Sequence, residues 1–286
     1  MKGIILAAGK GTRLYPMTKP ICKPLLPVYD KPLIYYPLTL LIRAGCQEIL
    51  IIVPPKEQEP FYQLLGDGST LGIHITYKEQ PVARGIADAF LLGEEFIGQD
   101  SVCLALGDNI FYSDHLHSQM EEAGQMHQGA VVFGYWVRDP RPFGVVEFDS
   151  AGQAISIEEK PRYPKSNYII PGLYFYDNQV VEIAKGLQPS ARGELEITDV
   201  NLEYLRRKQL RVLPLSRDCK WMDAGTADSM YTAAGMVRYL QEETGRYIGC
   251  IEEAAYRQGY ISVEQVHAAG DALKMTLYGQ YLQCIF

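Results

Sequence analysis

Short apolar or β-branched runs alternate with segments of helical pattern through the first half of the chain. Strands are predicted at residues 3–7, 48–53, 73–77 and 102–106, with helices at 32–44 and around 86–96. Strands that alternate with helices in this way are typical of βαβ units, whose strands lie parallel in one sheet. Residues 102–106 are apolar throughout, as expected for a central strand covered on both faces. The pattern therefore predicts an α/β fold with a mostly parallel, Rossmann-like sheet flanked by helices.

The pattern changes in the middle of the chain. Strand-like runs follow one another at residues 131–137, 144–148, 155–159 and 173–176 with little helix between them, which favours antiparallel additions. Helices return from residue 196, with a long one predicted at 227–243 and another at 263–269. We expect one α/β domain over residues 1–245, with an antiparallel lobe at about 130–220. A C-terminal helical segment over 246–286 would follow, and its aromatic residues suggest subunit packing.

Composition narrows the class of protein. The 286-residue chain has ordinary hydrophobic and charged fractions, and its formal charge of −7 argues against general nucleic-acid binding. No apolar run approaches the roughly 20 residues needed to span a bilayer. The first residues turn polar too soon for a secretory signal, and the six cysteines are scattered without a C-x-x-C pair. We expect a cytoplasmic protein with reduced cysteines and no membrane or nucleic-acid partner.

Positive charge is concentrated near the amino terminus of this acidic chain. Residues 10–31 contain five lysines or arginines and only one aspartate, which suits a polyanionic small ligand. A glycine-rich loop at 6–14 follows the first predicted strand, and its glycines would let backbone N–H groups approach phosphate oxygens. Arg13 adds a planar guanidinium suited to phosphate, and the start of a helix would add its dipole. A solvated basic loop and a plain β–α turn are the structural alternatives.

Two familiar phosphate loops do not match this segment. The dinucleotide fingerprint needs a third glycine where Leu14 stands, which disfavours a dinucleotide-dependent oxidoreductase. The P-loop needs Ser or Thr after its lysine, whereas Lys10 is followed by Gly11. The loop is therefore a third kind of phosphate site, and the proline-rich segment after it can hold Lys23 toward the phosphates. A simple proline-rich connector would explain the prolines but not the lysines.

Three acidic motifs could complete such a site. Asp108 follows the strand at 102–106, at the sheet edge where α/β proteins bind ligands and where Mg²⁺ would find a carboxylate. Asp223 is a second isolated carboxylate before a predicted helix. Glu159 and Lys160 end a strand of the second lobe and suit the hydroxyls and phosphate of a phosphosugar. Each motif alone has an ordinary alternative, such as an Asx turn, a helix cap or a surface strand edge.

Together these motifs are similar, over nearly the whole chain, to those of the glucose-1-phosphate thymidylyltransferases, which make dTDP-glucose. The segments that carry the resemblance are residues 6–14, 27–32, 65–68, 107–109, 143–148, 158–161, 172–176 and 192–199. The resemblance implies a Mg²⁺-dependent enzyme that joins dTTP to α-D-glucose 1-phosphate and releases pyrophosphate. It also implies in-line attack on the α-phosphorus without a covalent enzyme intermediate. Members of the family are commonly homotetramers.

The resemblance assigns roles to particular residues of this chain. Asp108 and Asp223 would hold the metal, and the catalytic cations would be Arg13, Lys23 and Lys160. The nucleotide would contact Leu6, Ala8, Gly9, Gly11, Thr12, Arg13, Lys23, Gln80, Gly85 and Asp108. The sugar phosphate would contact Asn109, Gly144, Glu159, Lys160, Ile170 and Trp221.

The likeness is weakest beside the nucleotide base. The family usually has Gln at the position of Pro24, and Ser-Pro-Asp at residues 82–84, where this chain has Val-Ala-Arg. Pro171 and Ala224 replace threonines, and Ala8 replaces a glycine. Because Pro24 cannot donate a backbone or side-chain hydrogen bond, we expect a relaxed or changed base preference, with UTP the leading rival to dTTP. A transferase for another hexose 1-phosphate and a catalytically silent regulatory relative are the remaining alternatives.

Overall fold

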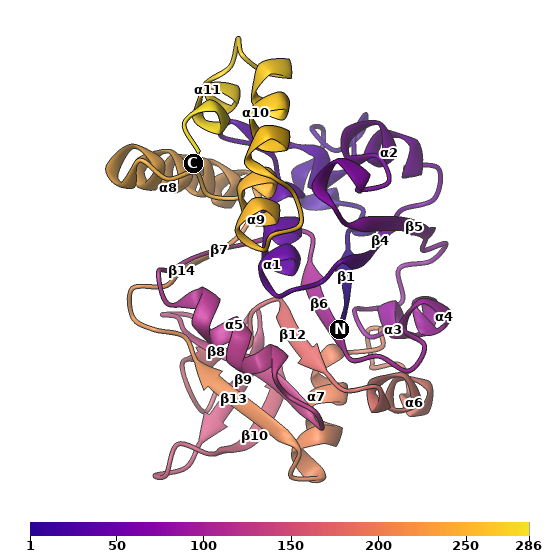
Figure 1. Cartoon of the computed structure of the whole chain (residues 1–286). Coiled ribbons are helices and arrows are strands. Elements are labelled where there is room, and N and C mark those ends of the chain that lie inside the picture. The colour runs from indigo at the N-terminus through magenta and orange to yellow at the C-terminus, as the bar shows by residue number, and fades with distance from the viewer. Residues whose placement is uncertain (286) are drawn as a thin grey trace.

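One ten-stranded mixed sheet organises the computed structural model, which describes residues 1–285 (Figure 1). Four neighbouring strands form its parallel half, in the order β6 (Val102–Leu106), β1 (Lys2–Leu6), β4 (Glu48–Val53) and β5 (His74–Glu79). Their pairing is parallel throughout. The four strands predicted in the first half of the chain are therefore confirmed, with boundaries that differ by at most two residues.

The antiparallel half continues the same sheet. β12 (Leu173–Tyr176) pairs with β6 on one side and with β8 (Ala130–Trp136) on the other. The other antiparallel strands are β9 (Gly144–Phe148), β10 (Ala154–Glu159) and β11 (Tyr168–Ile169). β13 (Leu210–Pro214) also belongs to this half, but it pairs with β8 in parallel. Figure 1 shows the sheet running from β5 at the upper right to β10 at the lower left. The four strands predicted in the middle of the chain are present, whereas β11 and β13 were not expected.

A bulge between β11 and β12 divides the sheet. Ile169 pairs with Tyr135 of β8, and Tyr174 pairs with Val132 of β8. The four residues 170–173 therefore stand opposite only two residues of β8, 133 and 134. Before the bulge the chain pairs with β9, and after it the chain pairs with β6. The Ile170 N–H donates to the Gly144 carbonyl oxygen at 2.9 Å, and the Gly172 carbonyl oxygen accepts from the Leu106 N–H at 2.9 Å. The sheet therefore forks at residues 170–172, beside the carboxyl end of β6.

Helices cover both faces of the sheet, because alternate strand residues enter two separate cores. The core that contains Ile5 includes residues of α1 (Tyr35–Arg43), α2 (Gln58–Leu65), α5 (Leu116–Gly124) and α9 (Ile251–Arg257). The core that contains Ile4 includes residues of α3 (Asp88–Leu92), α4 (Glu94–Ile97), α6 (Gln179–Gly186) and α7 (Ile197–Arg206). The α/β architecture with helices on both faces is confirmed.

Two predicted helices differ from the observed ones. The segment around 86–96 forms α3 and α4, which are separated at Gly93. The helix predicted at 32–44 begins only at Tyr35, after a hairpin of β2 (Pro27–Val28) and β3 (Lys31–Pro32). The glycine loop leads into a single 3₁₀ turn at Thr12–Leu14 rather than into a helix. The four prolines between residues 16 and 27 explain this, since proline cannot sit inside a helix without breaking its hydrogen bonds.

The C-terminal part of the chain is helical, as predicted. It consists of α8 (Ala227–Thr244), α9, α10 (Val263–Ala272) and α11 (Leu277–Gln283). Ile251, Val266 and Leu282 belong to the same core as α1, so these helices pack onto the α/β unit. The predicted aromatic end at Phe286 lies outside the described residues. Within residues 1–285, no helix combines the length and apolarity required to cross a membrane.

We expect the fork in the sheet to be sensitive to added volume at Gly172. A Cβ atom there would lie 2.7 Å from the Leu106 side chain and 2.8 Å from the Asn109 side chain, so Gly172→Ala must displace them. Overpacking of this kind costs about 1–3 kcal/mol. Chemical denaturation should show that loss in the free energy of unfolding. Gly235→Ala, in open space within α8, is the matched control and should stabilise the protein by about 0.5–1 kcal/mol.

Candidate active site

The glycine loop lies at the carboxyl end of the parallel strands. The Ala7 N–H donates to the Ile52 carbonyl oxygen at 2.8 Å, and the Gly107 N–H donates to the Leu6 carbonyl oxygen at 3.0 Å. Gly11 has a φ of 59°, and a Cβ atom there would lie 3.0 Å from Thr18. A side chain at this position would therefore be both strained and crowded. The loop turns sharply at Gly11, next to the segment that carries Asp108.

A short antiparallel pair of strands brings the two predicted metal ligands together. β7 (Asn109–Tyr112) pairs with β14 (Lys220–Asp223), and Asn109 stands opposite Asp223. The Ala224 N–H donates to the Asp108 carbonyl oxygen at 3.0 Å. Burial and the negative charge of Asp108 raise the pKa of Asp223, whereas the charges of Lys23 and Arg13 oppose this shift. The carboxylates of Asp108 and Asp223 therefore share one electrostatic environment.

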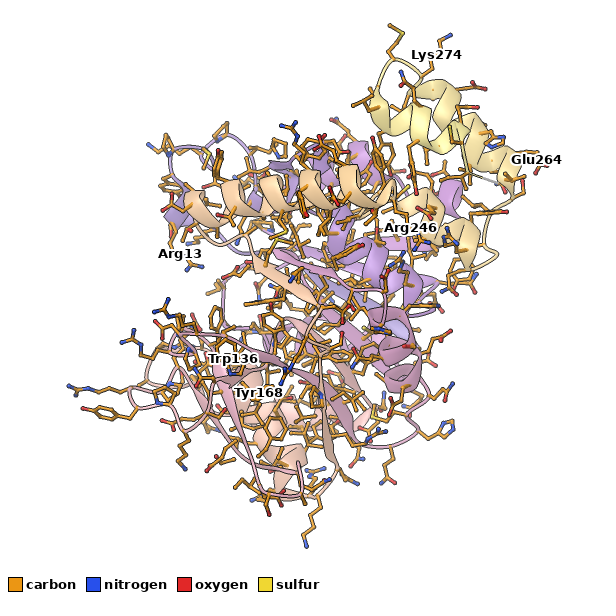
Figure 2. All side chains as sticks on the ribbon, turned by 90° about the vertical axis from the view of Figure 1, so that its left-hand side faces the viewer. Arg13, Trp136, Tyr168, Arg246, Glu264 and Lys274 are labelled. Atoms are coloured by element: carbon orange, nitrogen blue, oxygen red, sulfur yellow. The ribbon has the colours of Figure 1, made fainter. Side chains whose placement is uncertain are left out.

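Two of the predicted cations lie beside this pair of carboxylates. Lys23 Nζ lies 2.5 Å from Asp108 Oδ2, and the Lys23 side chain is buried. A Cβ atom on Gly225 would lie 2.9 Å from Arg13 Nη2 and 3.0 Å from Asp223 Oδ2, which puts the Arg13 guanidinium close to Asp223. Figure 2 shows Arg13 on the side of the molecule that faces the lobe with Trp136 and Tyr168. The loop and the two distant aspartates thus converge.

The residues present fit a hard divalent cation. No group of three or more His, Cys, Asp or Glu side chains in residues 1–285 could hold a metal by itself. Mg²⁺ is commonly bound by one or two carboxylates together with substrate phosphates and water, which matches the pair of Asp108 and Asp223. The Asp223 carboxylate accepts no hydrogen bond from the described part of the chain, so its oxygens are available as ligands. A cation between these carboxylates would also relieve their mutual repulsion.

A cavity of about 420 Å³ extends from the aspartate pair to the second lobe. Most predicted site residues line it, namely Leu6, Ala8, Gly9, Arg13, Gln80, Gly85, Asp108, Asn109, Gly144, Glu159, Lys160, Ile170, Trp221 and Asp223. Three predicted nucleotide contacts do not line it: Gly11, Thr12 and Lys23. Lys23 is instead buried against Asp108. The cavity therefore brings together both predicted halves of the site, although the roles of these residues remain predictions.

Glu159 and Lys160 are held in defined positions where β10 ends. Glu159 accepts a hydrogen bond from the Thr198 hydroxyl at 2.5 Å, and Arg192 Nη2 lies 3.3 Å from its other oxygen. Lys160 has a φ of 45°, a left-handed conformation that is unfavourable for a lysine. Its N–H donates to the Phe143 carbonyl oxygen at 3.0 Å. Strained backbone of this kind concentrates at functional sites, where surrounding contacts maintain it.

The wall predicted to lie along the base is connected to the second lobe. Gln80 follows β5, and its N–H donates to the Val53 carbonyl oxygen at 2.9 Å. The Arg84 carbonyl oxygen accepts from the Leu195 N–H at 2.6 Å, and the Leu195 carbonyl oxygen accepts from the Ala87 N–H at 3.1 Å. Between them Gly85 has a φ of 103°, and a Cβ atom there would meet the Leu195 carbonyl oxygen at 2.4 Å. Only glycine fits this connection.

Several cavity residues had been assigned no role in the site. They are Ala83, Ile86, Leu106, Pro142, Phe143, Pro171, Gly172, Tyr174, Arg192, Glu194, Glu196, Ile197, Thr198 and Asn201. Those at 192–198 belong to a segment that carried the family resemblance without a role, and its density of charged residues was the available signal. Pro24 and Ala224, two of the departures from the family, do not line the cavity, whereas Ala8 and Pro171 do.

Comparisons with known proteins identify the family of this chain. The family model for nucleotidyl transferases matches residues 2–238. A glucose-1-phosphate thymidylyltransferase of Neisseria gonorrhoeae is 52% identical over 282 residues, which cover 99% of this chain and 98% of that protein. The Mycobacterium tuberculosis enzyme of the same name is also 52% identical, with the same coverage.

Solved structures show the same fold. A Bacillus anthracis protein whose structure was solved in complex with sucrose is 44% identical in sequence to this chain. The two structures match with a TM-score of 0.77, over 83% of this chain and 95% of that one. A UDP-glucose pyrophosphorylase solved in complex with UDP-glucose is 27% identical in sequence to this chain, with a TM-score of 0.73. That match covers 84% of this chain and 98% of the pyrophosphorylase. With the family model matching most of its length and relatives half identical end to end, the chain belongs to the nucleotidyl transferase family, as its motifs predicted.

Proposed function

We propose that this enzyme transfers dTMP from dTTP to α-D-glucose 1-phosphate, giving dTDP-glucose and pyrophosphate. The observation that carries the proposal is one cavity that contains two facing carboxylates, Asp108 and Asp223, together with Arg13 and the Glu159–Lys160 pair. The relatives that are 52% identical bear the name of this reaction. UTP is the second candidate nucleotide, because Pro24 provides no contact in the cavity and a structural relative was solved with UDP-glucose.

Asp108 and Asp223 would hold Mg²⁺, with the remaining ligands coming from substrate phosphate and water. When bound, the ion neutralises charge on the triphosphate and makes its α-phosphorus more susceptible to attack. Lys23 would keep Asp108 oriented through its 2.5 Å ion pair, while Asn109 Nδ2 donates to the other oxygen of Asp108 at 2.8 Å. Asp108 would therefore enter the reaction with both of its oxygens already positioned.

The remaining residues would position the two substrates. Arg13 would bind oxygens of the triphosphate, and Lys160 would bind the phosphate of glucose 1-phosphate. Glu159, fixed by Thr198 and Arg192, would accept hydrogen bonds from sugar hydroxyls. A phosphate oxygen of the sugar then attacks the α-phosphorus in line, the bond to the β-phosphate oxygen breaks, and pyrophosphate leaves with the electron pair. The protein contributes positioning and charge stabilisation rather than a nucleophile.

A cytoplasmic location and assembly into a homotetramer are further parts of this proposal. All six cysteines are free and five of them are buried, which suits a reducing compartment. Leu273, Met275 and Leu277 are exposed on the C-terminal helices and on the turn between them, which suits packing between subunits.

Pyrophosphate release in the presence of Mg²⁺ and glucose 1-phosphate tests the proposed reaction. We expect turnover with both dTTP and UTP, with kcat/KM values that differ by far less than a thousandfold, because Pro24 offers no group to read the thymine edge. Steady-state rates with dTTP, UTP, CTP and ATP provide the comparison. A thousandfold preference for dTTP would contradict the relaxed selectivity. No release with any nucleotide would identify a catalytically silent relative.

Removing either cation that faces the substrates should lower the rate. Hydrogen bonds to charged groups contribute about 1.5–3 kcal/mol each, so Arg13→Ala and Lys160→Ala should each reduce kcat/KM at least tenfold. Arg238→Ala is the matched control, since that arginine is exposed on α8 and its one ion pair within residues 1–285 is with Glu242. A rate as low in Arg238→Ala as in the other two variants would show that general loss of positive charge, rather than these contacts, is responsible.

Asp223→Asn should separate stability from activity. Because the pKa of Asp223 is raised in the folded protein, its ionisation is less favourable there than in the unfolded chain. Stability is therefore lost as pH rises from the ordinary aspartate range toward the raised pKa, and it stays lost at neutral pH. In EDTA at pH 7 the variant should unfold at a higher Tm than the wild type. In a separate assay with Mg²⁺, its kcat/KM should be at least a hundredfold lower than that of the wild type.

Thermal unfolding with and without Mg²⁺ checks the same residue independently of turnover. Mg²⁺ should raise the Tm of the wild type and leave that of Asp223→Asn unchanged, because ligand binding stabilises only a protein that has the site. An equal response of the two proteins would exclude Asp223 as a metal ligand.

A further inference from the structure

Asp88 carries a set of contacts that the proposed mechanism does not use. It is the first residue of α3, and its side chain is almost completely buried. Its Oδ1 accepts a hydrogen bond from Arg84 Nη2 at 2.7 Å, and its Oδ2 accepts one from Gln80 Nε2 at 2.8 Å. A buried carboxylate depends on such donors, because an unpaired one would be very costly. Asp88 therefore connects the loop at 81–87 to Gln80 in the wall of the cavity.

These contacts determine which way the Gln80 amide points. An ionised carboxylate can only accept hydrogen bonds, so the nitrogen of the amide, and not its oxygen, must face Asp88. The Gln80 backbone is also held, by its N–H bond to the Val53 carbonyl oxygen. Within residues 1–285 the Gln80 side chain makes no other hydrogen bond, and Gln80 lines the cavity. Its carbonyl oxygen is therefore left as an acceptor for a ligand.

We infer that Asp88 is a positioning residue that makes Gln80 select a base with a ring N–H, which among pyrimidines means thymine or uracil. This inference rests on the proposed function, in which the cavity receives a nucleoside triphosphate. Thymine and uracil carry a hydrogen at N3, which the Gln80 oxygen can accept. Cytosine has a lone pair at the same ring position and would leave two acceptors facing each other, a mismatch that polar sites reject strongly.

The same geometry limits what this contact can distinguish. Thymine and uracil differ by a methyl group at C5 and share the N3–H donor, so the Gln80 oxygen treats them alike. Selection between dTTP and UTP must therefore come from elsewhere in the cavity wall. The Asp88–Gln80 pair separates both nucleotides from CTP.

Asp88→Asn tests the inference because it keeps the shape of the side chain and changes one acceptor into a donor. Arg84 has only donors, so it retains the oxygen of the new amide, whose NH₂ group then faces Gln80. The Gln80 amide must turn round to accept from it, which presents an NH₂ group to the base. We expect kcat/KM with dTTP to fall about tenfold and the ratio of kcat/KM for CTP to that for dTTP to rise at least tenfold.

Two controls separate positioning of Gln80 from general damage to the loop. Glu242→Gln changes an ion pair of the same i,i+4 type, with Arg238, that is exposed on α8, and it should leave the ratio unchanged. In a Gln80→Ala background, Asp88→Asn should have no further effect on the ratio. A loop that had merely loosened would change the ratio in both backgrounds.

The wild-type protein alone can overturn the inference. Equal calorimetric Kd values for dTTP and CTP, measured in Mg²⁺ without sugar phosphate, would exclude selection by Gln80. An unchanged ratio in a folded Asp88→Asn protein would exclude the role of Asp88. Because these Kd values do not depend on turnover, a chain that binds dTTP selectively but releases no pyrophosphate would refute the proposed function and leave the role of Asp88 standing.

Discussion

Strands β7 and β14 pair Asn109 with Asp223. Because Asp108 precedes Asn109, this pairing places the carboxylates of Asp108 and Asp223 near each other in a partly buried position. Such an arrangement is unfavourable by itself, since burial and the negative charge of Asp108 oppose ionisation of Asp223. Much of the surrounding structure offsets this repulsion: Lys23 is buried against Asp108, and Arg13 lies close to Asp223. The protein maintains these charges at a cost in stability, which is expected where binding of a cation to the same carboxylates repays it.

The fork in the sheet lies beside the same cavity as Asp108, Asp223 and Arg13. β11 pairs with β9, whereas β12 pairs with β6. The bulge at 170–172 therefore separates the β9 side of the sheet from the β6 side, next to the carboxyl end of β6. Asn109 secures the junction, since its Oδ1 accepts from the Gly172 N–H at 3.0 Å and from Trp221 Nε1 at 2.6 Å. The residues that border the aspartates are therefore tied directly to those that border the second lobe.

One segment of the second lobe contacts both predicted substrate regions. Leu195 is hydrogen bonded to Arg84 and Ala87 in the wall next to Gln80, while Arg192 and Thr198 hold Glu159. The segment at 192–198, a turn that leads into the start of α7, thus connects the predicted base wall to the predicted sugar site. A displacement of one region would be transmitted to the other through these hydrogen bonds, which is consistent with an enzyme that must align two substrates before reaction.

The sequence by itself determined the parallel half of the sheet, the glycine loop after β1 and Asp108 after β6, because apolar runs and turn residues report local structure. It also picked out Asp223, Glu159 and Lys160 as isolated charged motifs, to which the resemblance then assigned roles. Only the tertiary structure decided that Asp223 lies beside Asp108, through strands β7 and β14, and that Asp88 orients Gln80. The first depends on contacts between segments that lie far apart along the chain, and the second on the direction of one buried side chain. Local sequence patterns report neither of these.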